Sequence, residues 1–289
     1  MFSIVPGKFC AAYQLDPRMD LEKGRDKSMK KQTVQILKIK NGEIFPTEDE
    51  VAVERHLSVK INGEKMFSLN CTPEFLEELI LGRLYTEGMI RDKKQIKNIR
   101  ILRDQGEIHV SLSSKITSFS RAGWVFASSE QKERRDNAVP ENEESDEMKR
   151  GREMSEMSRL FRMADEIFED PGELFRDTGC AHCCALYLHG QIACRFEDVG
   201  RHNALDKAVG WALKKGLPLE ETVVFTSGRI SGDYLAKIIR AGISTVVSRA
   251  AVTGEAVKLA KNHGVAMYRF VRKGNGNCYS FLGKSLIKN

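Results

Sequence analysis

Apolar and polar residues alternate along the first part of the chain, which is the pattern of half-buried β-strands. The alternation covers residues 34–40, 50–54 and 56–61. The dipeptide Asn62-Gly63 then marks a tight hairpin turn, and residues 65–71 read as the returning strand. We therefore predict a β-hairpin with further strands before it.

The spacing of apolar residues becomes helical after Thr72. Thr72 suits a helix N-cap, the proline after it suits the first helical position, and the glutamates that follow favour the positive end of the helix dipole. Strands at 96–102 and 107–112 come next. These elements predict a smaller N-terminal α+β domain at residues 33–127, preceded by an irregular arm at 1–32.

A charged stretch separates this domain from the rest of the chain. Residues 128–153 have few apolar side chains and no periodicity, so they cannot bury enough surface to offset the entropy of ordering them. We interpret the stretch as a charged mobile linker, and a solvated helix is the alternative for part of it. Apolar residues return at helical spacing over 154–168.

Strands and helices alternate in the remainder of the chain, which begins with a hairpin around His189-Gly190. This rhythm indicates a parallel or mixed sheet covered by helices, so the predicted fold class is α/β with a larger C-terminal domain at 154–289. The predicted strands are 185–188, 191–196, 222–226, 245–248 and 265–271, and the predicted helices are 203–215, 233–241 and 254–263.

The composition narrows the class of protein. The chain has 289 residues, of which 41% are hydrophobic and 30% charged, as in a soluble globular protein. We expect a cytoplasmic protein, because the chain has neither a long apolar run for a membrane nor the pattern of a secretion signal. The net charge of +6 mildly favours anionic partners such as nucleotides or phosphorylated cofactors, although solvated surface accounts for most of it. No nucleic-acid-binding signature is present, and no nucleic-acid partner is expected.

The first candidate site is a cluster of thiols around one imidazole. Cys180, His182, Cys183 and Cys184 lie within five residues. Thiolates are nucleophiles and metal ligands, and a nearby imidazolium lowers a thiol pKa. The cluster could be a sulfur-carrying or redox thiol pair, or part of a metal site, although one C-x-x-C is half a tetrahedral ligand set. The alternative is that these cysteines are small apolar residues that fill the core, and this alternative applies most to Cys184.

The second candidate site is a polar loop between a predicted strand and a predicted helix. Such loops bind ligands in open α/β sheets, and a helix N-terminus offers unpaired N–H groups to an anion. Arginine can fork to a phosphate, and histidine can move a proton. Helix capping with an arginine–carboxylate pair is the alternative. The loop consists of Glu197, Asp198, Val199, Gly200, Arg201, His202 and Asn203.

Further loops after predicted strands carry small residues with an arginine. Glycine and serine at 226–232 let the backbone approach a phosphate, with Arg229 as the counter-charge. Residues 248–253 offer a similar turn around Arg249. Residues 270–277 are another candidate wall of an anion site, and the alternative there is an ordinary basic hairpin turn.

Several of these segments together resemble the FdhD family of formate dehydrogenase accessory proteins. The resemblance covers most of the chain from residue 34 to residue 280. The segments that carry it are DEVAVERHLSVKINGE at 49–64, EELILGRLYTEGMI at 77–90, TGCAHCCAL at 178–186, EDVGRHNALDK at 197–207, TSGR at 226–229 and FVRKGNGNCYS at 270–280.

The resemblance implies a cytoplasmic homodimer of the sulfurtransferase type whose larger domain has a cytidine-deaminase-like mixed α/β sheet. It implies that a cysteine desulfurase supplies sulfur as a persulfide. The sulfur then passes to the molybdenum cofactor with its two guanine dinucleotides, and a formate dehydrogenase depends on that step. A guanine nucleotide could bind in place of this cofactor as a mimic. The resemblance implies no metal ligand and no membrane partner. The cofactor-binding residues expected are His182, Glu197, Asp198, Gly200, Arg201, His202, Asn203, Ser227, Gly228, Arg229, Phe270, Val271, Arg272, Lys273, Gly274 and Asn275.

This chain departs from the resemblance at the sulfur-carrying cysteines. The family has a C-x-x-C in a loop that corresponds here to residues 119–128, and these contain no cysteine. Either Cys180, Cys183 and Cys184 supply the thiols, or the protein is a cofactor- or nucleotide-binding chaperone without sulfur transfer. A deaminase-type metal enzyme is a third interpretation, but the usual H-x-E with P-C-x-x-C pairing is missing.

Overall fold

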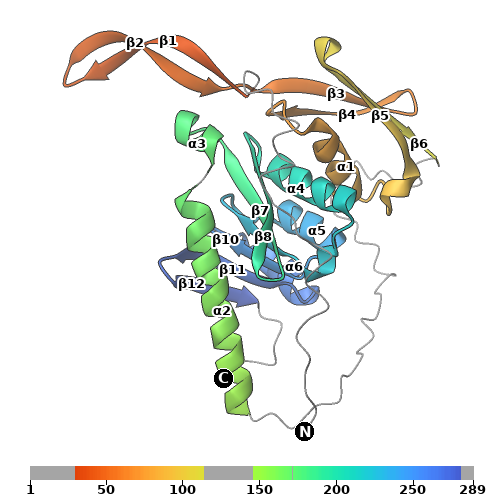
Figure 1. The fold of residues 1–289 in the computed structure, drawn as a ribbon, viewed down its shortest axis with the longest axis vertical. Helices are drawn as coiled ribbons and strands as arrows, with labels where there is room; N and C mark the ends of the chain where they lie inside the picture. Colours follow the sequence, from red (N-terminus) through yellow and green to blue (C-terminus); the bar gives the residue numbers. More distant parts are fainter. Residues whose placement is uncertain (1–29, 114–145, 171, 281–289) are drawn as a thin grey trace.

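The computed structural model describes residues 30–113, 146–170 and 172–280 (Figure 1). Their centre is a six-stranded sheet in the order β12-β11-β10-β9-β7-β8. Its strands are β7 (His182–Leu188), β8 (Gln191–Asp198), β9 (Val223–Thr226), β10 (Thr245–Ser248), β11 (Ala266–Arg272) and β12 (Asn275–Ser280). The predicted mixed α/β class is confirmed.

Strand direction brings five chain segments to one edge of this sheet. β9, β10 and β11 are parallel to one another, whereas β7 is antiparallel to both β8 and β9. β8 therefore runs in the same direction as β9, β10 and β11. The carboxyl ends of those four strands lie at the same edge as the start of β7, which places the loops that follow them beside the thiol cluster.

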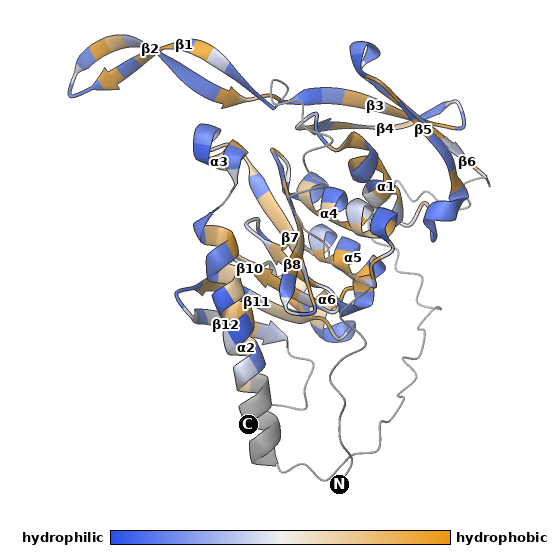
Figure 2. Ribbon diagram, viewed as in Figure 1, coloured by the Kyte–Doolittle hydropathy of each residue, from blue (hydrophilic) through white to orange (hydrophobic). Residues whose placement is uncertain are grey.

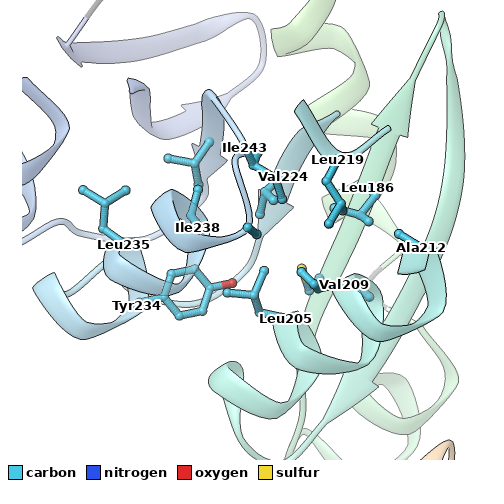
Figure 3. Close-up of a cluster of buried hydrophobic side chains, with 14 of the residues drawn as sticks. Leu186, Leu205, Val209, Ala212, Leu219, Val224, Tyr234, Leu235, Ile238 and Ile243 are labelled. Carbon is cyan, nitrogen blue, oxygen red and sulfur yellow. The ribbon is translucent and has the colours of Figure 1, made fainter. Parts of the chain in front are cut away.

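Helices cover both faces of the large sheet. Helix α2 (Asp146–Glu169) packs on one face through Leu160, Phe161 and Ala164, against Cys183 and Ala185 of β7. Helices α4 (Arg201–Lys215), α5 (Gly232–Arg240) and α6 (Gly254–Asn262) cover the other face. Figure 2 shows the apolar residues gathered on the strands between these layers, and Figure 3 shows part of the core on the α4–α5 side.

A second, four-stranded sheet in the order β4-β3-β6-β5 lies beside the large one. It consists of β3 (Arg55–Ile61), β4 (Glu64–Cys71), β5 (Ile96–Leu102) and β6 (Glu107–Leu112), and its apolar face packs on helix α1 (Leu76–Thr86). Short 3-10 turns occur at η2 (Lys93–Gln95), η3 (Arg103–Gln105) and η4 (Leu219–Glu221), and a short helix α3 (Glu173–Thr178) precedes β7.

Helices α1 and α4 join the two sheets at a glycine contact. A Cβ atom added to Gly82 would lie 1.8 Å from the carbonyl oxygen of Asp206, and one added to Gly210 would lie 1.9 Å from the carbonyl oxygen of Glu78. Only glycine allows backbones to approach this closely. Next to the contact, the Lys237 ammonium lies 2.9 Å from the buried Asp206 carboxylate.

An antiparallel hairpin of β1 (Lys31–Lys40) and β2 (Glu43–Ala52) projects from the body of the molecule (Figure 1). Its far end exposes apolar side chains, with Leu37 66%, Ile39 73% and Ile44 61% exposed. At its base, Lys31 pairs with Asp177 of α3 at 2.6 Å.

Three predicted boundaries differ from the structure. Helix α1 begins at Leu76 rather than near Thr72, because Phe75 takes a left-handed conformation (φ 53°) and Thr72 bonds to the β8–α4 loop instead. Helix α2 begins at Asp146, so the end of the expected linker is helical, which agrees with the alternative of a helix in that segment. The extent of β2 and the existence of α3 and β12 were not predicted. Residues 1–29 and 114–145 lie outside the described residues.

No described helix has both the length and the apolar character needed to cross a membrane.

Candidate functional site

The edge where the strand ends converge holds a cleft of about 590 Å³. Each segment at this edge contributes to the walls of the cleft. Cys180 precedes β7 and His182 is its first residue. Ser227 follows β9, Arg249 follows β10, and Arg272 is the last residue of β11. The rest of the lining is Phe168, Phe175, Gly179, Ala181, Cys183 and Val199. The cleft thus combines an exposed and a buried thiol, an imidazole, a hydroxyl and two guanidinium groups.

Among the three candidate thiols only Cys180 is exposed. Cys184 is completely buried in the core on the α4–α5 side, and burial raises its pKa well above the usual value. Cys183 is 3% exposed, and burial raises its pKa as well, against the opposing effect of Arg195. The Nε of Arg195 lies 3.2 Å from the Cys183 sulfur. Successive residues of a strand point to opposite faces of the sheet, so Cys183 and Cys184 are buried in different cores, Cys183 under helix α2 and Cys184 on the α4–α5 side.

His182 is half-buried at the start of β7. Burial, and then the charges of Arg201 and Arg229, hold its pKa below the ordinary value. Its Nδ1 lies 3.5 Å from the Ser227 hydroxyl, which accepts a hydrogen bond from the backbone N–H of Cys183 at 2.9 Å. The lowered pKa favours the neutral form of His182, and a neutral imidazole can accept a proton.

The acidic residues of the polar loop are engaged within the chain. Both oxygens of Glu197 accept hydrogen bonds from the first turn of α3, from the N–H groups of Leu174 (3.1 Å) and Phe175 (2.9 Å). Asp198 is completely buried and lies 2.7 Å from the Lys207 ammonium. Glu197 thus caps helix α3, and Asp198 forms an ion pair with a lysine. These contacts correspond to the structural alternative given for the polar loop, except that the cation is lysine rather than arginine.

The same loop is bonded to the smaller sheet. Asp198 accepts hydrogen bonds from the backbone N–H groups of Thr72 (3.2 Å) and Gly200 (2.9 Å). The Asn203 amide donates to Asp198 (2.9 Å) and to the carbonyl of Asn70 (2.7 Å). An added Cβ at Gly200 would lie 2.9 Å from that amide nitrogen. One wall of the cleft is thus held by residues 70–72, more than a hundred positions earlier in the chain.

The basic residues of the polar loop, and Arg229 in the loop after β9, are not among the residues that line the cleft. Arg201 donates to the Ser231 hydroxyl at 3.1 Å, and an added Cβ at Gly228 would lie 2.8 Å from the Cβ of Arg201. Arg229 is exposed and has no ion partner among the described residues. Burial lowers the pKa of His202 to about 4, although Asp233 lies 3.5 Å away.

The segment after Tyr268 forms a hairpin whose turn is bonded to helix α2. The backbone N–H groups of Lys273 and Gly274 donate to the two oxygens of Asp165 at 2.7 and 2.9 Å. The Asn275 amide closes the turn on the Lys273 carbonyl at 3.0 Å. Arg272, which has no described ion partner, extends from this hairpin into the cleft.

Phe270 and Val271 differ in exposure. Phe270 has a left-handed backbone (φ 54°), is 42% exposed and stacks on the Arg269 guanidinium at 3.9 Å, whereas Val271 is buried. An exposed aromatic ring over a cation is a surface on which a base could stack. Cofactor binding by the predicted residues remains a prediction.

Some lining residues were not expected from the sequence. Phe168 and Phe175 come from α2 and α3, and no local signal links either to a ligand. Val199 lies inside the polar loop, and that position is a sequence signal for a cleft residue. In the described part of the chain, no three His, Cys, Asp or Glu side chains come together in a way that would hold a metal ion.

Comparison with known proteins gives one consistent picture. The model of the FdhD/NarQ family matches residues 52–284. Sulfur carrier protein FdhD of Bacillus licheniformis is 33% identical over 247 residues, which cover 85% of this chain and 93% of that protein. Sulfur carrier protein FdhD of Shouchella clausii is 32% identical over 262 residues, with the same coverage of 85% and 93%.

A solved structure has the same fold. The crystal structure of a candidate formate dehydrogenase accessory protein from Desulfotalea psychrophila aligns with a TM-score of 0.65. The alignment covers 87% of this chain and 97% of the chain in that structure, at 24% sequence identity. At this identity the similarity concerns the fold alone.

Proposed function

Because the chain belongs to the FdhD/NarQ family, we propose that it is a sulfur carrier protein that serves the maturation of a formate dehydrogenase. In this proposal a cysteine desulfurase supplies the sulfur. The recipient is the molybdenum cofactor with its guanine dinucleotides, which the cleft binds as a substrate. The family resemblance adds a cytoplasmic location and a homodimer to the proposal.

The observation that supports this proposal best is the joint lining of the cleft by a thiol and by cations. Cys180 shares the cleft with Arg249 and Arg272, which come from two other strands. Guanidinium groups recognise phosphate through paired, charge-assisted hydrogen bonds. A cleft of about 590 Å³ lies within the range that accommodates small ligands and cofactors.

The first test is genetic. The full chain is expressed in a bacterium that lacks its own protein of this family, and formate dehydrogenase activity is measured. Restored activity supports the proposal, and an inactive dehydrogenase despite abundant soluble protein contradicts it. Restored activity in a strain that produces a variant with every cysteine replaced would instead favour a cofactor-binding chaperone without sulfur transfer.

The second test concerns the ligand. GDP binding to the purified chain is measured by calorimetry. The variant Arg272→Ala should bind GDP at least about tenfold more weakly, because a hydrogen bond to a charged group is lost. Arg100→Ala is the matched control, since Arg100 is an exposed arginine on β5 of the other sheet. Equal loss in both variants, or no binding by the unmodified chain, would contradict phosphate recognition in the cleft.

A further inference from the structure

The described cysteines differ sharply in access to solvent. Cys71, Cys183, Cys184 and Cys194 are buried, whereas Cys180 and Cys278 are exposed. Burial raises the pKa of Cys71 to about 12, and it raises the pKa values of the other three buried thiols. Since the thiolate is the reactive form, these four are poor nucleophiles.

The two exposed thiols have different surroundings. Cys278 lies on β12, its pKa is raised by burial, and its sulfur lies 3.6 Å from the carbonyl oxygen of Ser280. Cys180 lines the cleft together with Arg249 and Arg272. Cys180 is therefore the exposed thiol that shares a cavity with two guanidinium groups, whereas Cys278 does not line that cavity.

A proton acceptor lies next to Cys180 in the chain. His182 is two residues further on and lines the same cleft. The charged groups that face His182 are Arg201 and Arg229, which disfavour its protonation, and Asp198, which favours it. The cleft therefore holds the exposed thiol, an imidazole and two guanidinium groups within one cavity.

We infer that Cys180 is the thiol on which this chain carries sulfur and that His182 accepts its proton. This inference rests on the proposed sulfur-carrier function and narrows it to one cysteine. The donor is a persulfide, on a protein or on a small molecule.

The sulfur transfer balances without a further reagent. His182 takes the thiol proton, and the Cys180 thiolate attacks the terminal sulfur of the donor persulfide. The sulfur–sulfur bond of the donor breaks as a new one forms at Cys180, and the donor thiolate leaves and receives the proton. The transferred sulfur is neither oxidised nor reduced. The product is a Cys180 persulfide at the wall of the cleft.

The experiment uses the full chain and glutathione persulfide carrying isotopically labelled sulfur. Mass spectrometry of peptides maps the label for the unmodified chain, for Cys180→Ser and for the matched control Cys278→Ser. We expect label on Cys180, its loss in Cys180→Ser and its retention in Cys278→Ser. The urea unfolding curve of Cys180→Ser should match that of the unmodified chain, because Cys180 is exposed, and this match shows that the fold is intact.

The outcomes separate this inference from the function on which it rests. Label on Cys278, or on Cys10 outside the described residues, overturns the assignment of Cys180 and leaves a sulfur carrier. Label on no cysteine overturns both the assignment and sulfur transfer itself, even if GDP still binds.

A further variant tests the proton acceptor. His182→Gln should load sulfur roughly a hundredfold more slowly near neutral pH, because a general base is lost. The difference should shrink at alkaline pH, where the thiol ionises without help. An equal loading rate at neutral pH, or a defect that persists unchanged at alkaline pH, would overturn the role of His182.

Discussion

The ammonium of Lys207 lies 2.7 Å from the carboxylate of Asp198, and both side chains are completely inaccessible to solvent. The pair closes the β8–α4 loop from behind, with the backbone of Thr72 bonded to both partners. A buried ion pair of this kind is costly to break from one side, because the remaining charge stays buried without its partner.

We therefore expect Asp198→Asn to lower the free energy of unfolding by about 3–5 kcal/mol, measured by urea denaturation. The control is Glu77→Gln, which weakens an exposed pair with Lys214 at 2.9 Å. It should lower stability by at most about 1 kcal/mol. Similar stability of the two variants would show that the buried pair does not hold the loop.

The glycine contact between α1 and α4 predicts a second stability difference. Gly210→Ala places a methyl group against the backbone of Glu78, which cannot move aside as a side chain would. We expect a loss of about 1–3 kcal/mol in thermal or urea unfolding. Gly254→Ala should be nearly neutral, because an added Cβ there meets open space. An equally stable Gly210→Ala would mean that the helices separate easily.

Stability should also fall in weak acid because of His202. Burial lowers its pKa from 6.5 to about 4, so below about pH 6.5 the unfolded chain binds a proton that the folded chain refuses. The contribution of the buried, neutral His202 to the free energy of unfolding is fully present above pH 6.5 and is lost as the pH falls through about 4. It corresponds to about 3 kcal/mol.

The measurement is urea unfolding of the chain and of His202→Gln at about pH 7 and about pH 4. The unmodified chain should lose more stability over this interval than the variant. His189→Gln serves as the control, because His189 is largely exposed. If all three proteins lose the same amount, the burial of His202 does not govern acid sensitivity.

The buried position of Cys184 separates packing from chemistry. Cys184→Ala removes a core atom and should lower the free energy of unfolding by about 1 kcal/mol. Sulfur loading from glutathione persulfide should remain unchanged in this variant. Loss of loading with unchanged stability would reverse the assignment and make Cys184 the reactive thiol.

The sequence predicted the strands and helices where one face is buried. The alternation at 56–61 and the helical spacing at 203–215 correspond to β3 and α4. The start of α1 could not be predicted, because Thr72 is held by Val199 and Asp198, which are far away in the sequence. β12 was missed because its residues, Asn275–Ser280, show no apolar alternation.

The candidate site was predicted in part. Strand-to-helix loops indicated where the cleft lies, and Cys180, His182 and Ser227 line it. The sequence could not show that Cys183 and Cys184 are buried on opposite faces, because that depends on which layers cover the sheet. It also could not show that Glu197 is occupied by the N–H groups of α3, a helix that was not predicted.

The bonds from residues 70–72 to the β8–α4 loop affect how this protein can be divided into fragments. A fragment restricted to the larger sheet would leave Asp198, Lys207 and Asn203 without partners on one side. It would also expose the groove of α4 that α1 fills. The smaller sheet thus supports the loop that lines the cleft, and a minimal stable fragment has to begin before β3 rather than at α2.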